Sequence, residues 1–393
     1  MLNYISRLVG AAVFFSLLIA GASAEPFRPQ DTATVLEKLP LKPGDSQWRE
    51  LRQLRTELAA QPNNVAIAAK LARRYFDLVS AEGDPRYIGY AQAALAPWWT
   101  QPSPPVEVLV LRATLKQYRH DFSSALTDLD GAIAQDPRNP EALSLAATIH
   151  MVQGRYGEAR RKCEALRKFS TEVIGIGCLS MLDALEGRAK EAYDHLQAAL
   201  ARASDASPAQ RIWVLTRLGE IAARLGNYGA AEKHYREGLS LGLVDGYLLA
   251  AYADLLLDQN RPAEVLTLLK GMNRSDLLLL RMGLAAKMLA APDAEKYRAE
   301  LANRFEAAKM RGDKVHQAEE ARFRLSVMND PQGALPLAKE NWTVQKEARD
   351  ARILLESAIA AKDRAAAEPV LTWLKETKME DVILRRLAKQ LEG

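Results

Sequence analysis

Cysteine and histidine are scarce in this chain, whose 393 residues include only two cysteines and five histidines. The spacings C-x-x-C and H-E-x-x-H are both absent, so the zinc chemistry that those patterns support is not expected. A glycine-rich phosphate loop is absent as well. We therefore expect no metal site and no cofactor.

A surplus of charge is also missing. Lys and Arg number 53 against 49 Asp and Glu, and the formal net charge is +4. A protein that binds nucleic acid usually concentrates positive charge on one face, so this balance argues against a nucleic-acid partner. We interpret the basic run Arg160-Arg161-Lys162 as a solvated helix face.

Long apolar runs are confined to the N-terminus. The stretch from Leu8 to Ala20 is apolar apart from Gly10 and Ser16, and Ala22-Ser23-Ala24 fits the small-x-small cleavage rule. We predict a secretory signal peptide over residues 1–24, cleaved after Ala24, and a periplasmic or secreted protein that does not insert into the membrane once cleaved. The alternative is an inner-membrane anchor formed by an uncleaved signal.

Catalytic motifs are nearly absent too. One stretch, Gly238 to Gly242, satisfies G-x-S-x-G, but a hydrolase needs that motif between a strand and a helix. Here it falls at the end of a helical pattern, where Gly is typical of helix termination. We assign no catalytic residue and expect the protein not to be an enzyme.

What the chain does contain is a regular spacing of small residues. They recur at intervals of 33 to 35 residues, with one interval of 39. The positions are Ala91, Ala125, Ala159, Ala192, Ala231, Val265, Ala299, Ala334 and Ala367. A small residue repeated in this way suits the close crossing of two paired helices.

Other pattern positions keep step with these residues, most clearly Leu215, Gly219, Gly226 and Tyr228 ahead of Ala231. From about residue 105 to 270 the pattern resembles the tetratricopeptide-repeat (TPR) family. The resemblance implies an all-α fold, a right-handed α-solenoid of about eight or nine stacked antiparallel helix pairs, with degenerate repeats toward the C-terminus. Such a solenoid is usually a binding surface.

The same register predicts the organisation of the chain. After the signal peptide, residues 25–46 are punctuated by proline and should form an extended arm. Residues 47–275 should form the TPR solenoid with an N-terminal cap helix, and residues 276–393 degenerate repeats with a C-terminal capping helix. The interval of 39 residues predicts a longer connection near Ala199 to Pro208.

The two cysteines fall on either side of a turn between consecutive helices. Cys163 lies about eight residues before this turn and Cys178 about seven after it, which sets them at similar height in an antiparallel pair. Export to an oxidising compartment would allow a disulfide between them, which we predict. The alternative is two reduced cysteines that serve as small core residues.

The resemblance further implies that the first helix of each pair lines a concave groove. Carried over by register, the candidate ligand-binding residues are Tyr118, Met151, Met181, Trp213, Glu220, Arg224, Tyr247, Asp254 and Asp258. The groove would be apolar in its middle and acidic toward the later repeats. At the fixed groove positions where some family members use Lys, Asn and Arg to hold a C-terminal carboxylate, this sequence has Glu, Thr and Met. The alternative is that these side chains are covered by the N-terminal arm or by neighbouring helices and do not bind a ligand.

The sequence thus predicts a non-enzymatic protein–protein interaction scaffold of the bacterial cell envelope that binds a polypeptide segment in its groove. Tyr118, Met181 and Trp213 would be the apolar anchors, and Glu220, Asp254 and Asp258 would select a basic partner. The alternative is an accessory structural subunit of an envelope export or polysaccharide-assembly machine. The identity of the partner does not follow from the sequence.

Overall fold

The computed structural model describes residue 31 and residues 46–313 and 316–392. The predicted signal peptide and nearly all of the predicted arm lie outside these residues. The described part is all helical and contains no strand. The helices are α1 (Ser46–Ala60), α2 (Val65–Glu82), α3 (Arg86–Ala94), α4 (Ala96–Trp99), α5 (Val106–Tyr118), α6 (Phe122–Gln135), α7 (Pro140–Val152), α8 (Tyr156–Phe169), α9 (Glu172–Leu185), α10 (Ala189–Arg202), α11 (Pro208–Arg224), α12 (Tyr228–Ser240), α13 (Gly246–Asp258), α14 (Pro262–Leu268), α15 (Asp276–Met288), α16 (Ala294–Met310), α17 (Gln317–Arg322) with a π-helical turn (Phe323–Val327), α18 (Pro331–Val344), α19 (Ala348–Ala361), a 3₁₀ turn (Arg364–Ala367), α20 (Glu368–Thr377) and α21 (Val382–Glu392).

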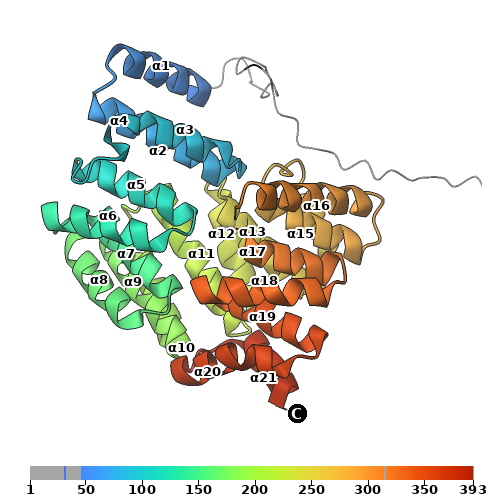
Figure 1. Ribbon diagram of the computed structural model, residues 1–393. Helices are drawn as coiled ribbons and strands as arrows, with labels where there is room; N and C mark the ends of the chain where they lie inside the picture. The colour runs from blue at the N-terminus through green and yellow to red at the C-terminus, as the bar shows by residue number, and fades with distance from the viewer. Residues whose placement is uncertain (1–30, 32–45, 314–315, 393) are drawn as a thin grey trace, which may run out of the picture. The chain divides into compact units, whose positions relative to one another are not determined.

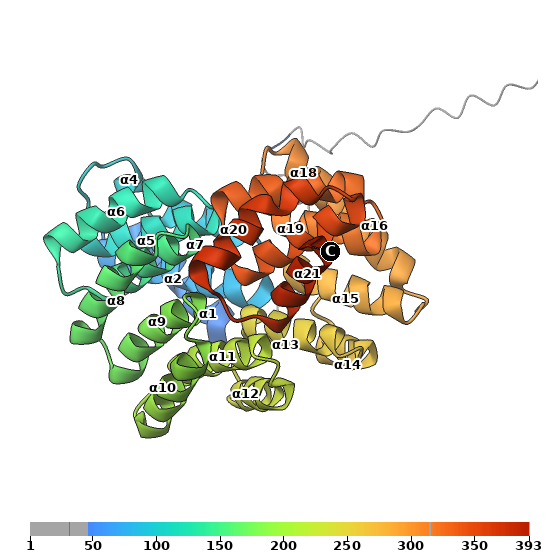
Figure 2. The same cartoon turned by 90° about the horizontal axis from the view of Figure 1, so that it is seen from below.

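The helices of the described part stack as antiparallel pairs, from α2 with α3 to α19 with α20 (Figure 1). The first helices of consecutive pairs, α5, α7, α9, α11 and α13, also contact one another and form an inner layer, while α6, α8, α10 and α12 lie outside them (Figure 2). The predicted α-solenoid is confirmed.

Local sequence explains where many of these helices begin. The side chains of Asn64, Asp121, Asn139 and Asn227 accept a hydrogen bond from the backbone N–H three residues on. These acceptors satisfy N–H groups that have no partner within the helix. Proline occupies the first turn of α7, α11, α14 and α18, where its missing N–H costs nothing.

The spaced small residues lie at the helix crossings, with one exception. Eight of the nine are at most 1% exposed, but Ala299 is exposed. The register predicted through Ala299 is therefore wrong. In that pair the small residue lies on the first helix instead, since Gly283 of α15 faces the fully buried Leu301 of α16.

The interval of 39 residues also has a different origin from the predicted one. Helix α11 has 17 residues, whereas α5, α7 and α13 have 13 each. The connection 203–207 that precedes α11 is no longer than the connection 241–245 that precedes α13. Most of the additional residues therefore lengthen the first helix of this pair.

The turn inside each pair contains one residue with positive φ. Glycine holds this place at Gly83, Gly154, Gly187 and Gly226, with φ between 68° and 81°. Among the described residues the other turns use non-glycine residues: His120, Asn260, Ala290, Asn329 and Lys362. Left-handed backbone is nearly free of strain only for glycine, so the other residues must be held there by their surroundings.

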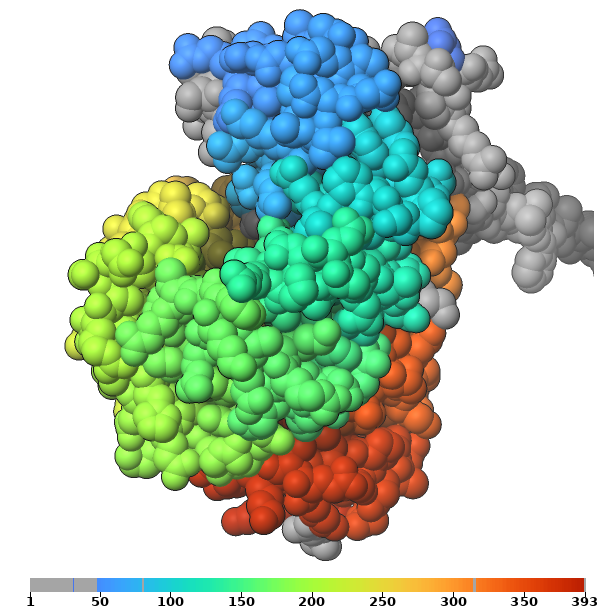
Figure 3. All heavy atoms as spheres, turned by 90° about the vertical axis from the view of Figure 1, so that its left-hand side faces the viewer, coloured from blue at the N-terminus to red at the C-terminus, as the bar shows by residue number. Residues whose placement is uncertain are grey.

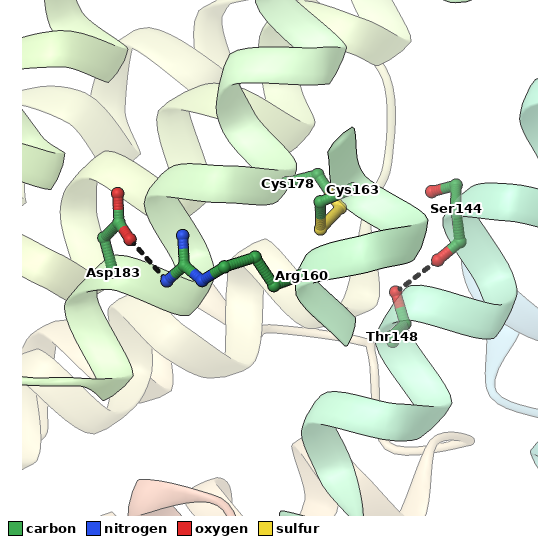
Figure 4. Close-up of a disulfide and its surroundings, with 6 residues drawn as sticks. All are labelled: Ser144, Thr148, Arg160, Cys163, Cys178 and Asp183. Atoms are coloured by element: carbon green, nitrogen blue, oxygen red, sulfur yellow. Dashed lines mark hydrogen bonds and ion pairs between the residues drawn. A yellow bond between two sulfur atoms is a disulfide. The ribbon is translucent and has the colours of Figure 1, made fainter. Parts of the chain in front are cut away.

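Helices α8 and α9 are joined covalently. A disulfide links Cys163 to Cys178, whose Cα atoms lie 5.5 Å apart (Figure 4). Beside it, Arg160 of α8 donates a hydrogen bond of 2.8 Å to Asp183 of α9. Two different connections therefore hold this outer helix to the inner layer.

Candidate functional site

The inner layer faces a later part of the same chain. We call residues 331–392, which form α18 to α21, the C-terminal module. In Figure 3 its red spheres lie directly against the green repeats. Residues in or next to the turns inside the repeats make these contacts. The backbone N–H of Ala189 donates a hydrogen bond of 2.7 Å to the carboxylate of Glu380, and Gly226 faces Val382. The indole N–H of Trp373 donates a hydrogen bond of 2.8 Å to the hydroxyl of Tyr156.

An extended segment joins α18 to α19 and lies against the turns of the early repeats. Gln345 and Glu347 have extended backbone, and the N–H of Lys346 donates 2.7 Å to the carbonyl of Val152 at the end of α7. The side-chain amide of Gln345 lies 2.9 Å from Nε2 of His120. Burial lowers the pKa of His120 to about 4, so this ring is neutral near pH 7 and can accept a hydrogen bond from the amide.

Two carboxylates of α13 bind arginines from distant helices. Asp254 accepts hydrogen bonds of 2.6 Å and 3.1 Å from Arg281 of α15 and of 2.7 Å from Arg322 of α17. Asp258 accepts two bonds, of 2.7 Å and 2.8 Å, from Arg352 of α19. Burial opposes the ionisation of Asp254, but the two guanidinium groups outweigh it and hold its pKa below the usual range.

Between the inner layer and the C-terminal module lies a partly open cavity of about 250 Å³, which we call the inner cavity. Its walls hold further charges. Arg217 lies 2.7 Å from Glu220 and stacks over the ring of Tyr247, 4.5 Å from its centroid. The hydroxyl of Tyr247 donates 2.6 Å to Glu220. The cavity is thus lined by paired charges and by apolar side chains.

Seven of the nine residues predicted for the groove line the inner cavity: Met151, Met181, Glu220, Arg224, Tyr247, Asp254 and Asp258. Two of the three predicted anchors do not. Tyr118 meets Phe76 edge to face, and burial raises its pKa to about 12. The ring of Trp213 lies against Gly177 of the neighbouring helix α9. The structure therefore brings the acidic residues to one place but not the three anchors.

A second hollow on the inner layer is not lined by the C-terminal module. We call this hollow, of about 780 Å³, the open groove. Its walls come from α5, α7, α9 and α11, from the last residue of α8 and from the turn after α8. They are Thr114, Pro140, Glu141, Ser144, Leu145, Thr148, Phe169, Ser170, Thr171, Ile174 and Gln210.

The open groove is largely uncharged. Its one charged side chain, Glu141, is paired with Arg73 of α2 through two hydrogen bonds of 2.7 Å and 2.8 Å. Thr148 donates its hydroxyl hydrogen to the carbonyl of Ser144 and keeps its oxygen as an acceptor (Figure 4). Phe169, at the rim, is 42% exposed. Sequence reasoning missed Phe169 because it is the last residue of a second helix, α8, outside the first-helix positions of the pattern.

Within the described ranges, no group of three or more His, Cys, Asp or Glu side chains could hold a metal ion. None of the helices in the same ranges combines the length and the apolar character needed to cross a bilayer.

This geometry defines a helical-repeat protein in which the C-terminal module of the same chain packs against part of the inner layer. Residues 118–169 match the family model of the tetratricopeptide repeat. Among solved structures, the APC/C hetero-tetramer Cut9-Hcn1 is similar over 88% of this chain and 66% of that chain, at 12% identity and a TM-score of 0.51. The chain thus contains a stretch that matches the tetratricopeptide repeat and has the fold of a helical-repeat protein.

Two further solved structures match this chain with lower structural agreement. The structure of pilF from Pseudomonas aeruginosa matches 73% of this chain and 97% of that chain, at 13% identity and a TM-score of 0.33. Yeast Tom70 matches 88% and 96%, at 11% identity and a TM-score of 0.30. A comparison with curated proteins finds no significant match. Identities this low show the fold alone.

Proposed function

We propose that this protein is a non-enzymatic scaffold of the bacterial cell envelope that binds an extended polypeptide segment of a partner in the open groove. The fold is one generally used for protein–protein interaction. The observation that supports the location is the accessible hollow of about 780 Å³ on the first helices of four consecutive repeats.

The chemistry of the open groove suits a peptide. Hydroxyl oxygens of Thr114, Ser144 and Thr148 can accept hydrogen bonds from backbone N–H groups, and Leu145 and Ile174 offer apolar contacts beside them. Phe169 at the rim can cover an apolar side chain of the ligand. A neutral, hydroxyl-rich wall favours a segment with small or apolar side chains over a highly charged one.

The test is capture of partners from an envelope extract by crosslinking, with two matched variants. Phe169→Ala removes an aromatic side chain that is 42% exposed in the open groove, and Leu243→Ala removes an aliphatic side chain that is 47% exposed elsewhere. We expect the first change to weaken capture about tenfold or more, as loss of an aromatic anchor does, and the second to leave it unchanged. Equal capture by both variants and the wild type would remove the open groove from the proposal.

The second candidate is an accessory structural subunit of an envelope export or polysaccharide-assembly machine. The observation that favours it is the contact between the C-terminal module and the repeat turns, since a superhelix packed against its own chain suits a rigid spacer. In that case partners would bind the outer helices. Capture would then be insensitive to Phe169→Ala and would be lost when outer positions such as Tyr90, which is 49% exposed, are changed.

A further inference from the structure

Two arginines of α11 carry a buried nitrogen that has no hydrogen-bond partner. Arg217 and Arg224 are seven residues apart on α11, so they lie on the same face of the helix, and both line the inner cavity. The Nε atom of each is buried and unpartnered among the described residues. A buried polar atom without a partner costs free energy, so such a site calls for a water molecule, an ion or a ligand.

The two guanidinium groups differ in how far they are already used. Arg217 lies 2.7 Å from Glu220 and stacks over the ring of Tyr247. Arg224 forms no hydrogen bond and no ion pair with any of the described residues. The guanidinium of Arg224 is therefore the one available to a molecule that enters the cavity.

The charges that line the inner cavity leave a cationic surplus. Among its described residues, each of four acids is paired with an arginine, and two cations and one acid remain, which are Arg224, Lys346 and Asp381. The pairs are Glu220 with Arg217, Asp254 with Arg281, Glu347 with Arg349 and Asp258 with Arg352. A ligand that complements this cavity therefore carries a negative charge.

Asp381, the remaining acid, does not pair with Arg224 directly. Its carboxylate accepts hydrogen bonds of 2.8 Å and 2.9 Å from the backbone N–H groups of Ile383 and Leu384 at the start of α21. Burial raises the pKa of Asp381, and the nearby charge of Arg224 opposes this rise. A water molecule between the two side chains is thus the alternative to a ligand, and the experiment has to tell them apart.

The rest of the cavity wall is largely apolar. It includes Met151, Met181, Leu185, Ile221, Leu255 and Leu384. Methionine side chains are flexible and adapt to ligands of different shape. The cavity is partly open, and its volume of about 250 Å³ lies just below the usual range of ligand pockets. These walls suit a small molecule with an apolar body, and its entry needs no separation of the C-terminal module from the repeats.

We propose that the inner cavity binds a small organic carboxylate with an apolar body, and that the guanidinium of Arg224 holds the carboxylate. A planar guanidinium fits a carboxylate through two parallel N–H donors. The apolar body lies against the methionine and leucine side chains of the wall. This site is distinct from the open groove, with which it shares only Thr148.

The experiment is isothermal titration calorimetry of the full chain with sodium hexanoate. We expect saturable binding to the wild type, and binding at least tenfold weaker to Arg224→Gln, because a hydrogen bond to a charged group is lost. Hexanol has the same apolar chain without the charge. It should bind the wild type more weakly than hexanoate does, and Arg224→Gln should bind it as the wild type does.

Two control variants locate the effect. Arg202→Gln removes the same charge from an exposed ion pair with Glu172 and should leave hexanoate binding unchanged. Phe169→Ala should also leave it unchanged, so that failure of the open groove as a peptide site and failure of this proposal are distinguishable. Equal affinity of the wild type and Arg224→Gln for hexanoate would overturn the proposal.

Two further outcomes would also overturn it. Binding of inorganic phosphate as tight as that of hexanoate would mean that the cavity accepts an adventitious ion only. No binding of hexanoate at all would mean that water fills the space beside Arg224.

A measurement on the wild type guards against a variant that fails to fold. Saturating hexanoate should slow hydrogen exchange of the Ile383 and Leu384 amides, which lie in the cavity wall and donate to Asp381. The amides of α5 and α6, which do not line the cavity, should keep their rates. Unchanged exchange at both Ile383 and Leu384 would contradict binding at this place.

Discussion

At the residue scale, the glycines of the repeat turns have two separate roles. Gly187 has a φ of 77°, and a Cβ atom built on it would lie 2.8 Å from the carbonyl oxygen of Lys378 in the C-terminal module. Gly242 has nearly the same φ, 78°, but nothing within 4 Å of the same position. The first glycine permits both a left-handed turn and a close approach of two parts of the chain, and the second permits only the turn.

This difference predicts unequal costs for the same substitution. Gly242→Ala should destabilise the protein by about 1 kcal/mol through backbone strain. Gly187→Ala should cost about 1–3 kcal/mol more, since the methyl group must also push the module away. Urea unfolding of the two variants gives both values. Equal losses would mean that the module does not rest on this turn.

A buried carboxyl makes stability depend on pH. Asp350 of α19 is fully buried and accepts hydrogen bonds from the Asn341 amide, 2.9 Å, and the Glu347 N–H, 3.0 Å. Burial raises the pKa of Asp350 to about 7, against the opposing effect of Arg349. In the unfolded chain the same group titrates near pH 3.9. Between about pH 4 and pH 7, folding therefore takes up a proton.

Stability should accordingly fall as pH rises through this window, by at most about 1.4 kcal/mol per pH unit from this group. Asp350→Asn cannot ionise and should remove that part of the slope. Urea unfolding of wild type and variant at pH 5, 6 and 7 measures the difference. Parallel pH profiles for the two proteins would contradict the assignment.

At the element scale, the repeat depends on one small residue at each helix crossing. Ala231 of α12 is fully buried, whereas Ala299 of α16 is exposed, although both were predicted from the same spacing. Ala231→Leu should overpack the crossing and cost about 1–3 kcal/mol. Ala299→Leu should change stability by less than about 0.5 kcal/mol, as surface substitutions do. Thermal or urea unfolding measures both changes in stability. A large loss of stability in the Ala299→Leu variant would support the register that the sequence predicted.

Helix boundaries were largely predictable because they depend on local chemistry. Helix α19 begins at Ala348, behind a capping box formed by Glu347 and Asp350, and ends at Ala361. Helix α18 begins at Pro331, with Asp330 as its cap. The lengthening of α11 was not predictable in the same way. Five additional residues can extend a helix or a loop at similar local cost, and only packing against the neighbouring helices selects between the two.

At the scale of the whole molecule, sequence periodicity reports which residues are equivalent but not which distant repeats meet. The contact of Gln345 with His120 joins residues 225 apart, and no spacing rule addresses such a pair. The sequence did contain a partial signal. Asp254 and Asp258 were predicted to select a basic partner, and basic residues of the same chain, Arg322 and Arg352, lie against them.

The placement of Tyr118 and Trp213 is a second case in which sequence periodicity does not report the neighbours of a residue. Their register positions are those of groove residues, yet Trp213 fills the space above Gly177 and Tyr118 packs on Phe76. A pattern position fixes the face of a helix on which a residue lies. Whether the neighbouring helix leaves that face open depends on side chains in another repeat.

The disulfide and the predicted signal peptide together predict the N-terminus and the thiol content of the exported chain. A disulfide between Cys163 and Cys178 persists only in an oxidising compartment. The exported chain should therefore begin at Glu25 by intact mass and contain no free thiol. A chain lacking residues 2–24 and retained in the cytoplasm should contain two. Closing a loop of 15 residues contributes about 3 kcal/mol in the chain-entropy model, so reduction should lower the free energy of unfolding by about that amount.

A variant with Cys163→Ala and Cys178→Ala separates the disulfide from the compartment, because its stability should be the same with and without reductant. Two free thiols in the exported protein would contradict the bridge. An exported protein that keeps residues 1–24 would instead favour the inner-membrane anchor. Since α8 carries Cys163 on the outside and α9 carries Cys178 within the inner layer, loss of the bridge should loosen this pair first, which hydrogen exchange of α8 can detect.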